Sequence, residues 1–449
     1  MKSLLNNLND VQGLLIYGYG YLRYADYLIL HFEGSPTESQ QFMAGILPDV
    51  VDAQVNPRQA CYALALGKTG LEKLGVEVSE HGGFSRAFIE GMNTPHRNRI
   101  LGDHGGNKPE NWLWGGEQHL SVDLLLISFA RSNEELQARR NSLEQKMAQH
   151  GVRTAHSVVD TYLDTKEHFG FRDGISQPVI KGSGRPVGQN DELPAGEFIF
   201  GYPNEYDKLP QAPAQIGKNG SYLVFRQLEQ DVMKFWNYFL TEAKNQNQEE
   251  AVYLAAKMVG RWPEGKPLVP ISDLSANEDM NARNWFGYYQ EDAKGFGCPH
   301  GAHIRRTNPR DALEDNPKQS LDASNKHRLL RRGRAYGLPL SSTFNVEEMM
   351  HTEDDGESRG LNFLCFNTDI ERQFEFVQHT WCNNDKFNRR YEEIDPISGV
   401  GHPKRQNSNF KIPEKPFRRR LTNLPQFVTL RGGAYFFFPS IAAIKKLST

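Results

Sequence analysis

The sequence predicts an α+β fold in which a sheet packed on one side by helices is built twice. Three observations predict this fold. Short apolar runs of strand length recur along the chain, amphipathic helical stretches follow several of these runs, and the second half repeats the order of the first. Some predicted strands follow one another directly in the sequence, and others are far apart. This uneven spacing favours an α+β fold over a fold in which strands and helices strictly alternate.

In the first half, strands are predicted at 27–32, 61–66 and 120–129, and the last of these, LSVDLLLISF, is the strongest strand signal. A helix is expected after it, because Ser132 with Glu135 three residues later forms the pattern of a capping box. The apolar stripe of this helix contains Leu136, Leu143 and Met147.

The second half repeats this pattern, with helices that begin at Asp231 and at about Asp369. Strands are predicted at 198–200, 222–225, 361–366 and 435–438, and an alanine-rich helix follows the last of them. The helix after Asp231 carries on one face Val232, Phe235, Trp236, Phe239 and Leu240. The helix from about Asp369 places in phase Phe374, Val377, Gln378 and Trp381.

We expect two domains, residues 1–165 and 166–449, because a chain of 449 residues exceeds the usual length of one domain. Long polar segments rich in glycine and proline show no clear periodicity, and these lie at 180–220, 262–300, 310–330 and 383–425. Segments of this length in a compact protein usually cover a functional site.

The composition excludes several classes of function. The formal net charge is −3, from 52 basic and 55 acidic residues, so there is no electrostatic case for a nucleic-acid or anionic-membrane partner. The apolar runs are far shorter than a membrane span, and the N-terminus does not resemble a secretory signal. The 4 cysteines form no CxxC pair, which indicates free thiols in a reducing compartment. We therefore expect a cytoplasmic protein.

The first candidate site is the stretch GFRDG, from Gly170 to Gly174. Its glycines let the backbone take positive φ angles and approach a flat or bulky group closely. Asp173 is either aimed at such a group or merely completes an Asx turn by bonding to its own backbone.

The second candidate site is the run CPHGAHIRRTNPR, from Cys298 to Arg310. His303 follows a Gly-Ala pair, which leaves room for a flat cofactor against the backbone, and neutral imidazole is a common metal ligand. The arginines of the run suit carboxylates or phosphates. One alternative is a core histidine beside a solvated basic face. Another is a zinc site of Cys298, His300 and His303, although this spacing matches no closed structural zinc site well.

The third candidate site is the run HRLLRRGRAYG, residues 327–337. The apolar Leu-Leu pair before Arg331 indicates that the backbone turns inward there, and a buried arginine needs an anionic or polarisable partner. The alternatives are a solvated basic turn and a nucleic-acid patch, which the near balance of charge does not support.

Together, an acid, a histidine ligand and an inward arginine are the minimum that a haem peroxidase requires. A five-coordinate haem iron needs one axial histidine. Bound peroxide needs a base that moves a proton from its inner to its outer oxygen, and a fixed positive charge near the breaking O–O bond.

At these residues the chain resembles the dye-decolorizing peroxidase family. The family motif GxxDG corresponds to residues 170–174, GAHIRRxNPR to 301–310 and RRGxxYG to 331–337. Similar segments occur at 10–20, 395–399 and 432–440, so the resemblance runs in order through nearly the whole chain. The long insertions resemble those of the larger members.

The resemblance implies two ferredoxin-like α+β domains, with antiparallel sheets and peripheral helices, and haem b (iron protoporphyrin IX) in a cavity of the C-terminal domain. It also implies a role for each candidate site. Asp173 would be the distal acid–base residue, Arg331 the charge-stabilising arginine and His303 the proximal iron ligand.

Further residues take expected roles from the same resemblance. Arg310 would pair with a haem propionate, and Leu361 and Phe363 would line the distal pocket. The partner of the second nitrogen of His303 orients the imidazole and strengthens its donation to iron. We expect Asp395 in this position, with Glu375 as the second choice.

The expected reaction reduces H2O2 and oxidises dyes, phenolics or other bulky one-electron donors. Because the base is a carboxylate, dye oxidation should be fastest in acid. The chain departs from the compact members in one place, since they carry asparagine two positions after the distal arginine and this chain carries Gly333. Two other functions stay open: a non-enzymatic haem carrier and a zinc-dependent hydrolase using the Cys298 cluster. We expect small-molecule partners only, and a monomer or a homodimer.

Overall fold

The first half of the chain forms a four-stranded antiparallel sheet. A computed structural model describes residues 4–163, 165–187, 191–270, 284–341, 343–401 and 408–449. The strands are β1 (Tyr24–Phe32), β2 (Ala60–Leu66), β3 (Leu124–Ala130) and β4 (Val152–Val159). They lie in the order β4-β1-β3-β2, and each neighbouring pair is antiparallel. Helices α2 (Pro36–Ile46) and α6 (Asn133–Gln149) connect them, which gives the βαββαβ order of a ferredoxin-like unit.

The second half repeats this topology. Its strands are β7 (Ser221–Gln230), β8 (Leu330–Arg331), β10 (Gly360–Asn367) and β13 (Val428–Phe438), and the short β9 (Arg334–Tyr336) also pairs with β10. They lie in the order β13-β7-β10-β8, which matches the order of the first half. The predicted α+β class with two ferredoxin-like units is confirmed. The boundary at residue 165 stays a prediction.

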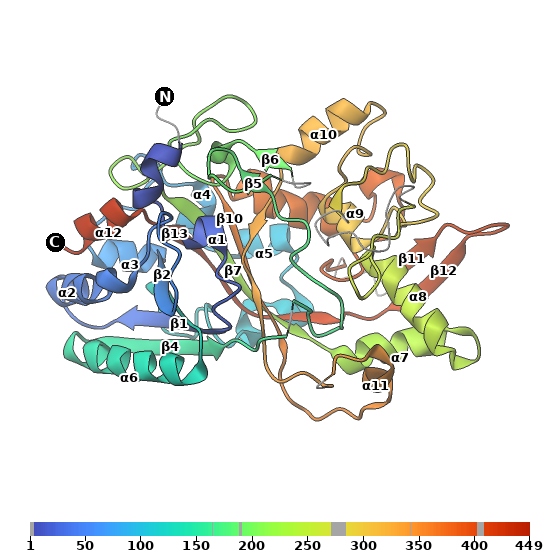
Figure 1. Ribbon diagram of the computed structural model, residues 1–449, viewed down its shortest axis with the longest axis horizontal. Helices are drawn as coiled ribbons and strands as arrows, with labels where there is room; N and C mark the ends of the chain where they lie inside the picture. Colours follow the sequence, from blue (N-terminus) through green and yellow to red (C-terminus); the bar gives the residue numbers. More distant parts are fainter. Residues whose placement is uncertain (1–3, 164, 188–190, 271–283, 342, 402–407) are drawn as a thin grey trace.

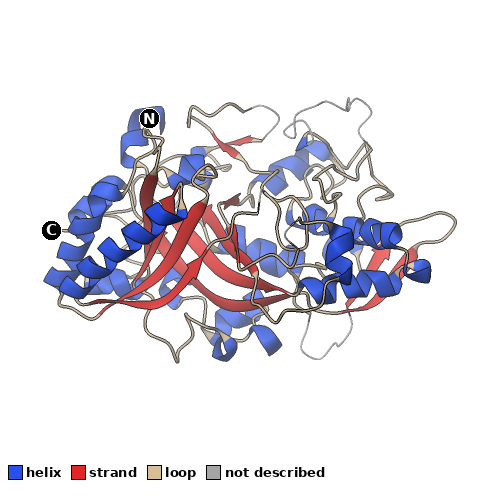
Figure 2. Ribbon diagram, turned by 60° about the horizontal axis from the view of Figure 1, so that its bottom comes forward, coloured by secondary structure: helices blue, strands red, loops and turns tan. Residues whose placement is uncertain are grey.

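The helices surround the strands (Figure 1, Figure 2). Besides α2 and α6, the α-helices are α1 (Leu14–Tyr17), α3 (Lys68–Lys73), α4 (Arg86–Glu90), α5 (Pro95–Leu101), α7 (Val232–Glu242), α8 (Gln248–Val259), α9 (His303–Thr307), α10 (Pro317–Asn325), α11 (Val346–His351) and α12 (Ile441–Leu447). Helices α2, α3, α6 and α12 lie beside the N-terminal strands, and α7, α8, α9 and α11 lie at the opposite end of the molecule (Figure 1). Among the described residues, none of the helices combines the length and the apolar character needed to cross a membrane.

Short helical and strand segments fill the connections between these elements. The 3-10 helices are η1 (Leu4–Asp10), η2 (Leu47–Asp49), η3 (Gly105–Asn107), η4 (Pro109–Asn111), η5 (Ala195–Glu197), η6 (Lys244–Gln246) and η10 (Phe387–Arg389). Two π-helical segments, η8 (Glu371–Glu375) and η9 (Val377–Cys382), follow β10. Two small sheets consist of β5 (Val179–Ile180) with β6 (Glu192–Leu193), and β11 (Ser408–Ile412) with β12 (Arg419–Leu424).

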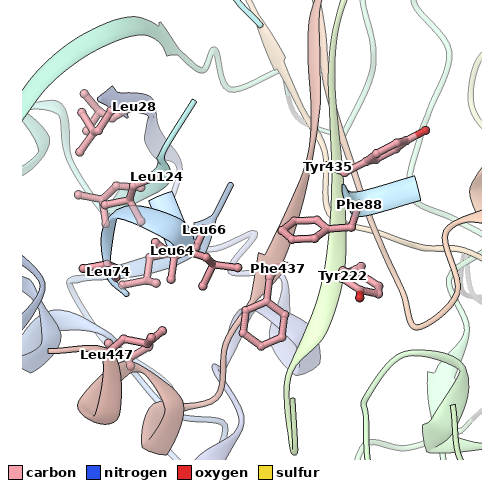
Figure 3. Close-up of a cluster of buried hydrophobic side chains, with 14 of the residues drawn as sticks. Leu28, Leu64, Leu66, Leu74, Phe88, Leu124, Tyr222, Tyr435, Phe437 and Leu447 are labelled. Carbon is pink, nitrogen blue, oxygen red and sulfur yellow. The ribbon is translucent and has the colours of Figure 1, made fainter. Parts of the chain in front are cut away.

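The apolar core has two large layers, one on each face of the strands. One layer joins β1 and β2 to α2, α6 and α12, and it continues onto β7 and β13. Figure 3 shows this layer, with Leu28, Leu64 and Leu447 on one side and Phe437 and Tyr222 on the other. The second layer contains alternate residues of the same strands, on their other face, and in it the rings of Tyr27 and Phe225, one from each half, lie 5.8 Å apart.

Most of the predicted helices and strands occur in the structure. The apolar run at 198–200 is a turn after η5 and not a strand, because the Phe198 amide bonds back to Ala195 and the Phe200 amide bonds to Gly220. The helix expected from Asp369 is present but is π-helical. Ser132 caps α6 by accepting the Glu135 amide, as its pattern predicted. The polar segments contain β5, β6, α10, β11 and β12, and parts of them lie outside the described residues.

A buried amide completes the junction between the two halves. β2 and β13 share one bridge pair, Phe437 with Leu66. Beside it, the Gln12 side chain donates to the Leu64 carbonyl at 2.9 Å and to the Pro439 carbonyl at 2.8 Å, and it accepts the Leu64 amide at 3.0 Å. Gln12 is 1% exposed, so these backbone groups depend on it for their hydrogen bonds.

Replacing Gln12 with leucine should therefore destabilise the junction. The change leaves buried backbone groups without partners, and such groups cost about 1–3 kcal/mol each. We expect the free energy of unfolding, measured by urea titration, to fall by roughly 3 kcal/mol. The control Gln54→Leu, at an exposed position, should change it by less than about 0.5 kcal/mol. Equal effects of the two substitutions would contradict this role of Gln12.

Candidate functional site

A cavity of about 310 Å³ lies in the C-terminal half. Its wall brings together the loop at 165–178, the start of α9, and strands β7, β8 and β10. Of the residues that the sequence singled out, the wall includes Asp173, His303, Arg310, Arg331, Leu361 and Phe363. The volume falls in the range of small-molecule and cofactor sites.

The GFRDG stretch forms a tight loop that packs on α7. Gly170 has a φ of +91°, and a Cβ added there would lie 2.7 Å from the Cε of Met349. Both observations explain glycine at this position. The ring of Phe171 packs edge-on against Phe235, and the amide of Asp173 donates to the Thr165 carbonyl at 2.9 Å. The loop therefore holds Asp173 at the cavity wall.

Asp173 forms an ion pair with Arg331 at this wall. Arg331 Nη1 lies 3.0 Å from Asp173 Oδ1, and the two side chains are 31% and 37% exposed. The Arg331 amide donates to Gln177 Oε1 at 3.0 Å, so a second residue of the same loop holds the arginine backbone. Burial by itself would raise the pKa of Asp173, but the Arg331 guanidinium and the Gly174 amide hold it below its ordinary value. Asp173 is therefore a carboxylate in mild acid.

His303 lies at the start of α9, and its ring also lines the cavity. Both carboxylate oxygens of Asp395 lie 3.0 Å from His303 Nδ1, which leaves Nε2 as the ring nitrogen on the cavity side. Asp395 is fully buried and also accepts the amides of Ile397 and Ser398. Burial would lower the pKa of His303, but Asp395 raises it above its ordinary value. The carboxylate thus fixes the orientation of the ring and increases its basicity.

Glu375, the second choice as the partner of His303, lies elsewhere. It accepts a hydrogen bond from Arg97 Nη1 at 2.6 Å and from the Tyr435 hydroxyl at 2.8 Å. Arg97 and Tyr435 are buried with Glu375, which is the last residue of η8. This carboxylate therefore belongs to a hydrogen-bond network separate from that of His303.

Three buried arginines of the run at 298–310 do not form a solvated basic face. Arg305 donates to Asp292 and to the Cys298 carbonyl, and Arg306 donates to the Trp381 carbonyl at 2.6 Å. The guanidinium of Arg310 donates to the Asn284 and Phe286 carbonyls while the residue lines the cavity. These hydrogen bonds fix α9 and the residues that follow it to the neighbouring segments of the chain.

The zinc site proposed for the Cys298 cluster has no support in the described residues. No group of three or more His, Cys, Asp or Glu side chains within these ranges has a metal-binding arrangement. The thiol of Cys298 is directed toward the Pro299 carbonyl, and burial lowers the pKa of His300 to about 3.

The cavity also contains charged residues to which the sequence analysis gave no role. In the described part of the wall these are Glu167, Arg172, Arg226, Arg261 and Arg328. With Arg310 and Arg331, cationic side chains outnumber the carboxylates that line the wall, and Arg226 and Arg328 pair with Asp103 and Asp191 outside it. Arg172 and Arg328 lie inside the candidate motifs, whereas Glu167, Arg226 and Arg261 lie outside them.

The wall therefore fits haem b. One imidazole nitrogen faces the cavity, an acid and a guanidinium pair form another part of the wall, and an excess of arginines matches two propionates. Apolar side chains for a porphyrin plane come from Leu228, Leu361, Phe363, Phe374 and Val377. When bound there, the haem would be held by His303 and by arginines such as Arg310.

Comparisons with known proteins identify relatives along the whole chain, although no family model matches it. Dye-decolorizing peroxidase AauDyP1 of Auricularia auricula-judae is 34% identical over 292 residues, which are 62% of this chain and 55% of that relative. That match therefore spans about half of the relative's length. Peroxidase 2 of Mycetinis scorodonius is 30% identical over 470 residues, 98% of this chain and 87% of that protein.

A solved structure gives the same result. It comes from work on asymmetric sulfoxidation by engineering the heme pocket of a dye-decolorizing peroxidase. It matches with a TM-score of 0.81 at 26% identity, over 99% of this chain and 100% of that one. The likeness therefore covers both halves of the fold.

Gly333 provides a test of how Arg331 is held. It lies between β8 and β9, and a Cβ there would lie 2.5 Å from the Asn362 carbonyl oxygen of β10. Gly333→Ala should force the strands apart and lower the free energy of unfolding by about 1–3 kcal/mol. Chemical denaturation measures this change. Gly45→Ala, in α2 with no atom within 4 Å of the added Cβ, should be stabilising instead. A neutral effect at Gly333 would contradict the packing argument.

Proposed function

The chain belongs to the dye-decolorizing peroxidase family, and we propose that Asp173, Arg331 and His303 carry its reaction with hydrogen peroxide. Members of the family are haem enzymes and oxidoreductases that act on H2O2. The observation that carries the proposal is the Asp173–Arg331 ion pair at the wall of a cavity that His303 also lines.

Each residue has a distinct task in this proposal. Haem b, when bound, supplies the iron at which peroxide is reduced. Asp173 accepts a proton from one peroxide oxygen and returns it to the other, which leaves as water. Arg331 stabilises the negative charge that develops as the O–O bond lengthens. His303, with its Nδ1 proton held by Asp395, would hold the haem iron through Nε2.

Other cavity residues would bind the haem or exclude water from the peroxide site. Arg310 would pair with a propionate, as its place in the cavity wall and its fixed guanidinium support. Leu361 and Phe363 would exclude water from the peroxide site. The reducing substrates would be dyes, phenolics or other one-electron donors, and two donated electrons with two protons complete the reduction of H2O2 to water.

The main alternative is a haem carrier without catalysis. Simple binding of haem requires neither a carboxylate nor a guanidinium beside the site of peroxide, whereas peroxide cleavage requires both. The purified protein should therefore be red-brown, and its Soret band should shift when H2O2 is added. A haem-loaded protein whose spectrum does not respond to H2O2 would favour the carrier.

The substitution Asp173→Asn tests the proposed acid–base role. We expect the rate constant of the reaction with H2O2, measured by stopped-flow absorbance, to fall by a factor on the order of 10²–10⁴ while haem stays bound. Asp355→Asn is a matched control, because Asp355 pairs with Arg359 outside the cavity and is 42% exposed. It should react at the parental rate. If Asp173→Asn reacts at the normal rate, another group or water moves the proton.

The substitution Arg331→Leu tests whether the Arg331 guanidinium lowers the pKa of Asp173. The reaction requires the carboxylate form of Asp173, so its rate is lost as pH falls through the Asp173 pKa, which Arg331 lowers. Without Arg331 the effect of burial dominates, the pKa rises, and the acid limb of the pH–rate profile should move to higher pH. Arg331→Lys retains the positive charge and should shift it less. An unmoved acid limb in Arg331→Leu would assign that limb to a group other than Asp173.

A further inference from the structure

A partly buried glutamate, Glu167, lies at the base of the loop that presents Asp173. The two carboxylate oxygens of Glu167 accept the Phe171 amide at 2.8 Å, the Phe169 amide at 3.0 Å and Gln230 Nε2 at 2.5 Å. Glu167 also lines the cavity, beside the proposed acid–base residue. Neither the family motif GxxDG nor the proposed mechanism uses this side chain.

The three contacts determine the path of the loop. Its backbone folds back on itself, since the Glu167 amide donates to the Phe171 carbonyl at 2.9 Å and the Gly170 amide donates to the Glu167 carbonyl at 2.8 Å. The carboxylate fills the inside of this turn. Asp173 follows two residues after Phe171, so its position depends on the turn.

The third contact ties the loop to the sheet. Gln230 is the last residue of β7, which pairs along its length with β10 and β13. β10 carries Leu361 and Phe363, which also line the cavity. Glu167 therefore connects the loop of Asp173 to strands that form another part of the wall.

The arrangement uses both oxygens of Glu167 as acceptors, and an apolar side chain of equal size supplies neither. The amide N–H groups of the buried Phe169 and Phe171 need acceptors. Burial raises the pKa of Glu167 to about 7, while the bonds from Phe169, Gln230 and Phe171 favour its ionised form.

We propose that Glu167 is the positioning residue for Asp173, whose carboxylate sets the loop turn and ties it to Gln230 so that Asp173 faces the peroxide site. The proposal rests on the proposed acid–base role of Asp173. It predicts that Glu167 affects proton transfer at Asp173 more than it affects haem binding.

Cyanide binding provides a test without turnover. Hydrogen cyanide, like H2O2, gives up a proton when it binds ferric haem, so its association rate depends on a correctly placed base. In the haem-loaded protein, Glu167→Leu should slow cyanide association by about 100-fold, as measured by the Soret shift, because a displacement near 1 Å costs this much. Haem content and the resting Soret band should not change. Glu167→Gln retains one acceptor oxygen and should lie between the parent and Glu167→Leu.

The haem-free protein provides an independent measurement. Amide hydrogen exchange at Phe169 and Phe171 should become faster in Glu167→Leu, since these amides lose their acceptor. Glu197→Gln is the control, because Glu197 is a buried carboxylate that also accepts a backbone amide, from Glu205 at 2.9 Å, but does not line the cavity. It should leave both cyanide association and exchange at 169–171 unchanged.

The outcomes separate this proposal from the proposed function. If Asp173→Asn is slow with cyanide and peroxide while Glu167→Leu and Glu167→Gln match the parent, the positioning role is wrong. If Asp173→Asn itself reacts normally, the acid–base role fails instead. If Glu167→Leu does not fold, the isosteric Glu167→Gln decides, and a parental cyanide rate in that variant overturns the proposal.

Discussion

The ion pair between Asp173 and Arg331 is the interaction around which the site is built, because it joins a loop to an edge strand. The loop holds the pair twice, through the Asp173 carboxylate and through Gln177, which accepts the Arg331 amide. The arginines that follow Arg331 in the sequence donate hydrogen bonds to the N-terminal half instead. Arg332 donates to the carbonyls of α1, and Arg334 donates to the Tyr19 carbonyl and to Asp160. The short segment from β8 to β9 therefore fixes the cavity arginine and contacts the N-terminal half.

This arrangement requires close approach of backbones and buried charge, and both reduce stability unless they are compensated. Gly333 has no side chain because the Asn362 carbonyl occupies the space of a Cβ. A buried arginine is tolerated when hydrogen bonds compensate its charge, and both terminal nitrogens of Arg306 donate to backbone carbonyls. The excess of cavity arginines fits a dianionic cofactor, whose carboxylates would complete the charge balance. The wall is thus a framework for a ligand rather than a self-sufficient core.

Much of the fold follows from local patterns, and much of the site does not. The apolar runs of β1 and β7, which are buried along most of their length, and the apolar face of α7 are visible in the sequence, because each depends on local composition. The turn at 198–200 has the same apolar composition as a strand, and only its long-range contacts distinguish it. Motifs located Asp173, His303 and Arg331. Glu167 and Gln230 are 63 residues apart in the sequence, so no local pattern predicts their contact.

Two aspartates in the cavity region show how surroundings separate their tasks. Asp395 is fully buried, and its carboxylate accepts bonds from His303 and from the amides of Ile397 and Ser398, which favour a permanent anion. Asp173 has one charged partner, and 37% of its side chain is exposed at the wall, so a small molecule can reach it and exchange a proton. Both pKa values lie below the ordinary range, yet only Asp173 has access. In the proposed function, the difference in solvation and access, not in pKa, is what suits Asp173 to proton transfer and Asp395 to orientation of the imidazole.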